Sequence, residues 1–203
     1  LDDTLRLNSK RVWIVDPLDG TKSFVNRNEE FCILIGLVEN HIPILGVIVQ
    51  PINNKLFIAV RNKGAYVYES NQWKKLTVTT NAPLETSRAI LSKNHFSEKE
   101  KNFLSYLNME NVLHRGSALK ITTLSEGNAE IYFTFSDQLK QWDTCASNCI
   151  LTEAGGVMTD LDGEKLNYNT KNLLHDKGIL ATTSQFHILI LQKIKNYKNG
   201  NTN

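Results

Sequence analysis

The sequence is poor in the features that mark secreted, membrane-spanning or nucleic-acid-binding proteins. Its three cysteines, Cys32, Cys145 and Cys149, are an odd number in apolar or helical surroundings. This usage favours a reducing compartment over a disulfide scaffold, so we expect a cytoplasmic location. A formal net charge of +2, with 22% charged residues, provides no strong electrostatic field. Composition therefore predicts neither a nucleic-acid partner nor a polybasic membrane-binding surface.

Long hydrophobic runs are also missing. The longest, FCILIGLV at 31–38, is far shorter than the roughly 20 residues that cross a bilayer, so no membrane span is predicted. The first residues have neither an initiator Met nor the layout of a signal peptide, and we expect the chain to begin part-way through a longer gene product. What the chain does have is 41% hydrophobic residues. This is enough for the core of a single domain over residues 1–203.

The first part of the chain, about residues 11–80, is predicted to form an antiparallel meander. Residues 12–15 are short, apolar and β-branched, and we expect this strand to stop at Asp16-Pro17. The acidic motif that follows is then placed at the carboxyl end of a strand. Four more β-rich runs separated by turn signals lie at 31–39, 42–51, 55–60 and 64–69.

The second part, about residues 86–195, alternates between strands and helices. Ser97 followed by Glu100 has the capping-box spacing that starts a helix. The predicted strands are 87–93, 129–135 and 177–183, and the predicted helices are 97–108, 117–127, 142–156 and 184–197. A sheet followed by alternating elements predicts an α/β (α+β) fold of stacked layers.

The segment WIVDPLDGTKSF, residues 13–24, carries Asp16 and Asp19 at the end of an apolar run. These carboxylates cannot share one face of a regular strand, but a turn begun by Asp-Pro can fold both toward one point. Oxygen-rich turns of this kind suit Mg²⁺. Gly20 lets the backbone approach a ligand closely, and the Thr21 hydroxyl can orient a water. The alternative is a solvated turn that opens a helix, and spacing alone does not decide between the two.

Asp143, in QWDTCASNC, is the second acidic candidate. It fits an ordinary helix N-cap as well as a metal ligand, and Trp142 beside it is more typical of a core anchor than of a ligand-stacking ring. Cys145 and Cys149 have no further His or Cys to complete a zinc set, so we interpret them as small buried side chains. DLDGEK at 160–165 is interpreted as a turn between strands rather than a calcium loop.

Two motifs taken together resemble a known family. WIVDPLDGTKSF followed by WDTCASNCILTEAGG is similar to the paired signatures of the Mg²⁺-dependent, lithium-sensitive phosphatases, which include inositol monophosphatases, fructose-1,6-bisphosphatases and 3'(2'),5'-bisphosphate nucleotidases. Among these, EEFCILIGLVENHIPILGVIVQP, SKNH and GSALK look most like the CysQ type of bisphosphate nucleotidase. The resemblance covers Arg11 to about Ile194. It implies the αβαβα sandwich of that superfamily, here lacking the first helical layer.

The resemblance also implies roles for individual residues. Asp16, the backbone carbonyl of Leu18, Asp19 and Asp143 match the ligands of two or three Mg²⁺ ions. Asp16, Asp19 and Thr21 would carry catalysis, with Thr21 helping to hold the attacking water. The implied substrate-binding residues are Leu18, Asp19, Gly20, Thr21, His95, Ser117, Lys120 and Asp143. Without the resemblance, Ser117 and His95 are loop residues and Lys120 is a surface cation.

Two features depart from the family pattern. Family members carry an upstream Glu-Glu pair whose first Glu binds metal, and these 203 residues do not contain it. Asp2 and Asp3 fall just after that place and are not assigned as its replacement. Many nucleotidases place an Arg shortly after the Tyr, toward a second phosphate, where Thr134 stands here. Lys140 would replace that Arg only if the loop before the second motif bends inward.

The predicted function is Mg²⁺-dependent removal of the 3'-phosphate from 3'-phosphoadenosine 5'-phosphate, giving AMP and phosphate, as in sulfur assimilation or nucleotide recycling. An inositol monophosphatase is the alternative enzyme. A protein of another class, a silent remnant that binds metal or nucleotide or serves as a scaffold, is the second alternative because the upstream Glu is missing. The expected partner is a phosphorylated small molecule, and family analogy alone suggests a homodimer.

Overall fold

The computed structural model describes residues 3–200, so Asp2 lies outside the described part of the chain. Its first sheet has six strands in chain order, each antiparallel to the next. The strands are β1 (Arg11–Asp19), β2 (Cys32–Glu39), β3 (Ile42–Gln50), β4 (Lys55–Val60), β5 (Gly64–Glu69) and β6 (Gln72–Lys75). The predicted meander is confirmed, with β6 as an additional strand.

The prediction that the first strand stops at Asp16 is wrong, because β1 continues through Pro17 to Asp19. Since β1 is an edge strand, a proline there need not break a ladder hydrogen bond. The pairing shifts at this point, so that Asp16 lies opposite Leu34 and Asp19 opposite Cys32. Three steps along β1 therefore match two steps along β2, which is a β-bulge. The bulge places both carboxylates on the same face of the sheet, the face on which Cys32 and Leu34 are buried.

The second sheet has five strands in the order β11, β13, β9, β7, β8. β7 runs parallel to β8 and β9, while β13 is antiparallel to its two neighbours. The five strands are β7 (Ala89–Ser92), β8 (Val112–Arg115), β9 (Ile131–Thr134), β11 (Gly156–Thr159) and β13 (Ile179–Thr183). A further two-stranded ladder joins β10 (Leu139–Lys140) to β12 (Leu174–His175).

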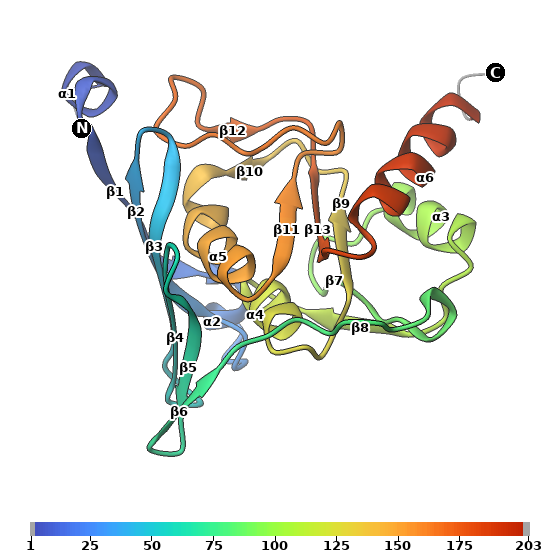
Figure 1. Ribbon diagram of the computed structural model, residues 1–203, viewed down its shortest axis with the longest axis horizontal. Coiled ribbons are helices and arrows are strands. Elements are labelled where there is room, and N and C mark those ends of the chain that lie inside the picture. Colours follow the sequence, from blue (N-terminus) through green and yellow to red (C-terminus); the bar gives the residue numbers. More distant parts are fainter. Residues whose placement is uncertain (1–2, 201–203) are drawn as a thin grey trace.

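The helices form layers with these sheets (Figure 1). α4 (Leu119–Ser125) and α5 (Gln141–Glu153) lie between the two sheets, and α3 (Glu98–Tyr106) and α6 (His187–Gly200) cover the far side of the second sheet. Three short helices complete the described chain: α1 (Asp3–Asn8), α2 (Thr21–Val25) and the 3₁₀ turn Leu84–Thr86. The layer order is sheet, helix, sheet, helix. No helix of residues 3–200 lies across the outer face of the first sheet, as expected for the sandwich without its first helical layer.

Glycines in the first sheet set how closely α5 approaches it. A Cβ placed on Gly36 would lie 2.4 Å from the Cys145 sulfur, and one on Gly46 would lie 2.4 Å from the Ala146 carbonyl oxygen. Only glycine leaves room for the helix at these two positions. Cys145 and Cys149 are buried free thiols on this helix, as the sequence predicts.

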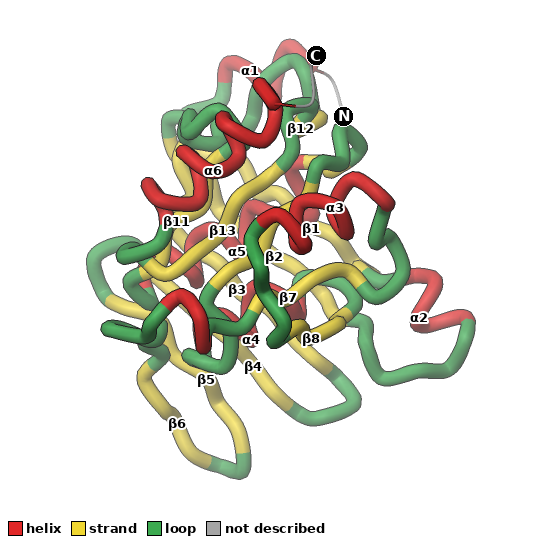
Figure 2. Tube along the Cα trace, turned by 90° about the vertical axis from the view of Figure 1, so that its right-hand side faces the viewer, coloured by secondary structure: helices red, strands yellow, loops and turns green. Residues whose placement is uncertain are grey.

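The same arrangement is visible from a second direction. Figure 2 shows the yellow strands of both sheets behind α6 and α3, with the first and last helices close to the chain ends at one end of the molecule. Within residues 3–200, no helix has the length and apolar character needed to cross a membrane.

Candidate active site

The bulged end of β1 and the first turn of α5 bring three carboxylates together. One oxygen atom from each of Asp16, Asp19 and Asp143 lies within 4.8 Å of the other two. All three side chains are partly buried. The sequence predicted that these residues would converge, although Asp143 is more than 120 positions from the other two, and the structure confirms their proximity. Their roles as metal ligands remain a prediction.

Each carboxylate is held by hydrogen bonds to one of its oxygens. Asp16 Oδ1 accepts from the Leu18 backbone N–H at 3.0 Å, and Asp143 Oδ2 accepts from the Lys140 backbone N–H at 2.8 Å. Asp19 Oδ2 accepts from the Ala118 backbone N–H at 2.7 Å and from the Ser117 hydroxyl. Asp143 is the third residue of α5, in its first turn, so the alternative interpretation of Asp143 as an N-cap does not hold. These bonds fix the orientation of all three groups.

The electrostatics of this cluster favour a bound cation. The pKa of Asp143 is raised to about 6, mainly by burial, and the neighbouring charges of Asp19 and Asp16 contribute to this rise. Burial also raises the pKa of Asp16, with a smaller contribution from Asp19. Like charges at this distance disfavour ionisation, and a hard divalent cation with oxygen ligands removes that repulsion. The donor set therefore fits Mg²⁺.

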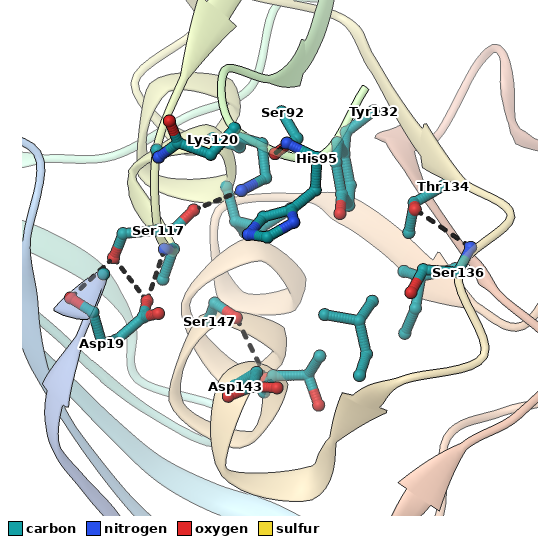
Figure 3. Close-up of a pocket in the computed structure, with 18 of the residues that line it drawn as sticks. Asp19, Ser92, His95, Ser117, Lys120, Tyr132, Thr134, Ser136, Asp143 and Ser147 are labelled. Atoms are coloured by element: carbon teal, nitrogen blue, oxygen red, sulfur yellow. Dashed lines mark hydrogen bonds between the residues drawn. The ribbon is translucent and has the colours of Figure 1, made fainter. Parts of the chain in front are cut away.

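A cavity of about 620 Å³ opens beside the cluster. Figure 3 shows Asp19 and Ser117 on one side of it, Asp143 and Ser147 below, and Thr134 and Ser136 on the opposite side. Its polar lining includes Asp19, Thr21, Lys22, Ser92, Asn94, His95, Ser117, Lys120, Tyr132, Thr134, Ser136, Gln138, Asp143, Thr144 and Ser147. A concave space into which polar side chains converge, next to an acidic cluster, is suited to a phosphorylated small molecule.

Gly20 joins β1 to α2 at the edge of the cavity. Its φ of +87° is left-handed, and a Cβ there would lie 2.7 Å from the Glu30 carbonyl oxygen, so only glycine fits this turn. Thr21 follows, lines the cavity and donates from its hydroxyl to the Leu18 carbonyl at 3.1 Å. Leu18 itself is not among the cavity-lining residues. Its predicted contribution is its backbone carbonyl.

The other predicted substrate residues also lie around the cavity. Ser117 adopts a left-handed φ of 59°, and its carbonyl accepts a hydrogen bond of 2.6 Å from Lys120 Nζ. Burial lowers the pKa of Lys120, while the nearby Asp19 acts in the opposite direction. Figure 3 shows His95 on the side of the cavity next to Lys120. The structure thus brings together His95, Ser117 and Lys120, whose contacts with substrate stay predictions.

Several cavity residues escaped the sequence analysis. Tyr132, Ser136 and Ser147 line the cavity. No local motif marks them, because Tyr132 is in β9, Ser136 follows that strand and Ser147 is in α5, and only the tertiary fold brings the strand and the helix to one cavity. Thr134, at the place of the family Arg, is only 6% exposed. Lys140 is not among the lining residues, and its Nζ lies 5.1 Å from the centre of the Trp142 ring.

Comparisons with known proteins identify the family. Residues 2–199 match the inositol monophosphatase family. A 3'(2'),5'-bisphosphate nucleotidase CysQ of Escherichia coli K12 is 33% identical over 174 residues, which are 86% of this chain and 69% of that protein. The corresponding protein of Buchnera aphidicola is 37% identical, over 80% of this chain and 60% of its own length. This chain therefore spans about three fifths to two thirds of these curated relatives.

A solved structure shows the same fold. The crystal structure of CysQ from Bacteroides thetaiotaomicron, described as a bacterial member of the inositol monophosphatase family, superposes with a TM-score of 0.81 at 30% identity. The match covers 90% of this chain and 73% of that one. The inositol monophosphatase of Thermotoga maritima gives a TM-score of 0.79 at 25% identity, covering 95% and 72%. On sequence and on fold, the chain belongs to the inositol monophosphatase family.

Proposed function

We propose that this chain carries the active site of a Mg²⁺-dependent phosphomonoesterase that removes the 3'-phosphate of 3'-phosphoadenosine 5'-phosphate, giving AMP and phosphate. The observation that carries the proposal is the convergence of three carboxylates at one end of a 620 Å³ cavity lined by Thr21, Ser117 and Lys120. The names of the curated relatives support the choice of a bisphosphate nucleotide as substrate.

Asp16, the Leu18 carbonyl, Asp19 and Asp143 would hold the metal. Mg²⁺ bound there would neutralise phosphoryl oxygens and lower the pKa of a bound water. The chain prepares the site because Ser117 and Ala118 already orient Asp19, and the Lys140 N–H orients Asp143. Outer partners of this kind keep ligand groups in a fixed direction.

Other residues of the chain act on the phosphate and the water directly. Lys120, held by the Ser117 carbonyl, supplies a buried positive charge that attracts the phosphate. The Thr21 hydroxyl gives its hydrogen to the Leu18 carbonyl, so toward the cavity it can accept a hydrogen bond from a water and orient it. Asp143 lies in the first turn of α5. The backbone N–H groups of a first turn have no partner within the helix, so this end of α5 favours a nearby anion such as a phosphate.

An inositol monophosphatase is the second candidate. Neutral Thr134 stands where many nucleotidases place an Arg for a second phosphate, and a solved inositol monophosphatase with bound inositol monophosphate has the same fold at 26% identity and a TM-score of 0.79. One substrate panel separates the candidates. Phosphate release with increasing Mg²⁺ is measured for 3'-phosphoadenosine 5'-phosphate and for inositol 1-phosphate, and faster release from the second would overturn our first choice.

Asp19→Asn tests the assignment of the site itself. Losing the negative charge at the centre of the cluster should lower Mg²⁺-dependent turnover by at least about 100-fold, as expected for a metal ligand. Circular dichroism and thermal unfolding should show that the variant remains folded. Unchanged turnover in a folded variant would contradict the proposed site. Mg²⁺ or nucleotide binding by the unaltered chain without any turnover would instead support the silent binding protein.

A further inference from the structure

A buried carboxylate, Glu100, lies behind the cavity wall that Thr134 forms. It is the third residue of α3 and only 4% exposed. Its Oε2 accepts hydrogen bonds from the backbone N–H and the hydroxyl of Ser97, both at 2.6 Å. Its Oε1 accepts from the Thr134 hydroxyl at 2.7 Å and the Phe135 backbone N–H at 3.1 Å. The side chain therefore links the start of α3 to the end of β9.

The donors that hydrogen-bond to this carboxylate are backbone N–H groups and hydroxyls, all of them neutral. Within residues 3–200, no Lys, Arg or His forms an ion pair with Glu100. The Thr134 hydroxyl donates to Glu100 Oε1. Because a hydroxyl carries a single hydrogen, that hydrogen is committed to Glu100 and is not offered to the cavity.

The direction of this hydrogen bond determines what the wall offers to a ligand. The Ser136 backbone N–H donates to Thr134 Oγ1 at 3.2 Å, which occupies one of the two lone pairs of that oxygen. Figure 3 shows this bond at the side of the cavity opposite Asp19. What remains on Thr134 is one acceptor position.

Tyr132 lines the cavity from the same strand, two residues before Thr134. Burial raises the pKa of its hydroxyl, and the charge of Glu100 is the next cause. Its ring faces Lys120, whose Nζ lies 5.6 Å from the ring centre. The hydroxyl whose hydrogen Glu100 fixes is that of Thr134.

We propose that Glu100 is a specificity-determining residue, because it turns the Thr134 hydroxyl so that this wall accepts a hydrogen bond from the leaving group of the substrate. The inference rests on the proposed phosphatase function. A sugar hydroxyl or an amine satisfies such a wall, whereas a second phosphate brings only acceptors and negative charge to it. The cation that could balance a phosphate, Lys120, is bound to the Ser117 carbonyl, and its Nζ lies 5.6 Å from the centre of the Tyr132 ring.

Glu100→Gln reverses the polarity of the wall. With the amide oxygen facing the two Ser97 donors, the amide nitrogen donates to Thr134, whose hydrogen then turns to the cavity. The change is measured by comparing two substrates. Adenosine 3'-monophosphate has a 5'-hydroxyl where 3'-phosphoadenosine 5'-phosphate has a 5'-phosphate. We expect the ratio of kcat/KM to shift toward the bisphosphate by about fivefold, mainly through KM, since one reoriented hydrogen bond contributes about 1 kcal/mol.

Two further variants make the test decisive. Glu98→Gln removes a charge from an exposed position of the same helix, where its partner is Lys101, and should leave the ratio unchanged. Thr134→Val removes the hydroxyl that carries the polarity, and should shift the ratio in the same direction as Glu100→Gln. If Glu100→Gln fails to fold because Phe135 loses its acceptor, Thr134→Val alone decides.

Binding of the products separates this inference from the proposed function. Calorimetric dissociation constants for adenosine and AMP require no turnover, and their ratio should shift by the same factor. If the unaltered chain hydrolyses neither substrate, the proposed function fails, yet the binding ratio still tests Glu100. Equal ratios in the unaltered chain and in the folded Glu100→Gln and Thr134→Val variants would overturn the inference.

Discussion

At the scale of single residues, the turn at Gly20 accepts little besides glycine. It combines a left-handed φ of +87° with a backbone oxygen, that of Glu30, 2.7 Å from where a Cβ would sit. Either condition alone disfavours a side chain. Because Asp19 and Thr21 flank this residue, any adjustment of the turn moves two proposed catalytic groups at once.

Gly20→Ala should therefore destabilise the protein by about 1–3 kcal/mol and greatly reduce phosphate release. Urea unfolding monitored by fluorescence gives the first quantity. Gly64→Ala is the matched control, because Gly64 has a similar φ of +85° but its nearest neighbour would lie 3.6 Å away. The control should lose stability only through the strained backbone conformation, and it should release phosphate at the unaltered rate. Equal behaviour of the two variants would contradict the role of the close contact.

The part of the candidate site that lies in short continuous motifs could be predicted from the sequence. Asp16, Asp19 and Asp143 lie in two motifs that can be matched as strings. The contact between Glu100 and Thr134 could not be predicted in this way, because the two residues belong to different elements and no motif links them. The capping box of Ser97 and Glu100 was predicted and is confirmed. Its second function at Thr134 depends on β9 reaching α3, which no local pattern encodes.

At the scale of elements, α5 positions Asp143 through its contact with the first sheet. The helix touches β2 and β3 at Gly36 and Gly46, where a Cβ would come within 2.4 Å of helix atoms. At Gly46 the opposing atom is a backbone oxygen, which cannot rotate away. The distance between β1 and α5, and hence the spacing of the three carboxylates, follows from this packing.

Gly46→Ala should push α5 outward, costing about 1–3 kcal/mol of stability as expected for overpacking. It should also weaken Mg²⁺ binding, because Asp143 moves with the helix. Isothermal calorimetry with Mg²⁺ and thermal unfolding measure the two effects. Gly200→Ala, at a position with open space around it, is the control and should change neither. If the Gly46→Ala protein is destabilised but binds Mg²⁺ with full affinity, the packing of α5 against the sheet does not control the metal site, and this prediction is contradicted.

The elements that sequence analysis missed are short or irregular. β8 and β11 have four residues each, too few for a periodic pattern to stand out from a loop. β1 was cut at Asp16-Pro17, because the rule for the residue before proline takes no account of an edge strand. The bulge between Asp16 and Asp19 was likewise hidden, although it is what brings the two side chains to one face.

At the scale of the whole molecule, the alternation of sheets and helices places α5 in the centre, with buried polar groups fixing its first turn. The 168–175 segment packs against this turn. Gln141 is 2% exposed, accepts from the Asn169 backbone N–H at 2.7 Å and donates to the Thr170 hydroxyl and the Asn172 carbonyl. His175 Nε2 lies 2.8 Å from the Thr144 hydroxyl. Global stability and the position of Asp143 are thus coupled through one helix end.

This coupling predicts a dependence of stability on pH through His175. Burial lowers the pKa of His175 from 6.5 to about 4, so its folded form stays neutral while the unfolded chain takes up a proton near pH 6.5. Its contribution to stability is complete above pH 6.5 and is lost as the pH falls toward 4. Each unit of pKa difference corresponds to about 1.4 kcal/mol, so the whole loss is about 3 kcal/mol.

His175→Gln isolates this effect from the other titrating groups, since Asp143 contributes equally to both proteins. The free energy of unfolding is measured by urea denaturation from pH 4 to 8 for each protein. We expect the unaltered chain to be the more stable one above pH 6.5 and its advantage to shrink by about 3 kcal/mol as the pH reaches 4. A stability difference that does not change with pH would show that the pKa of His175 is the same in the folded and unfolded protein. The contact between His175 and Thr144 of α5 would then tolerate a charged imidazole.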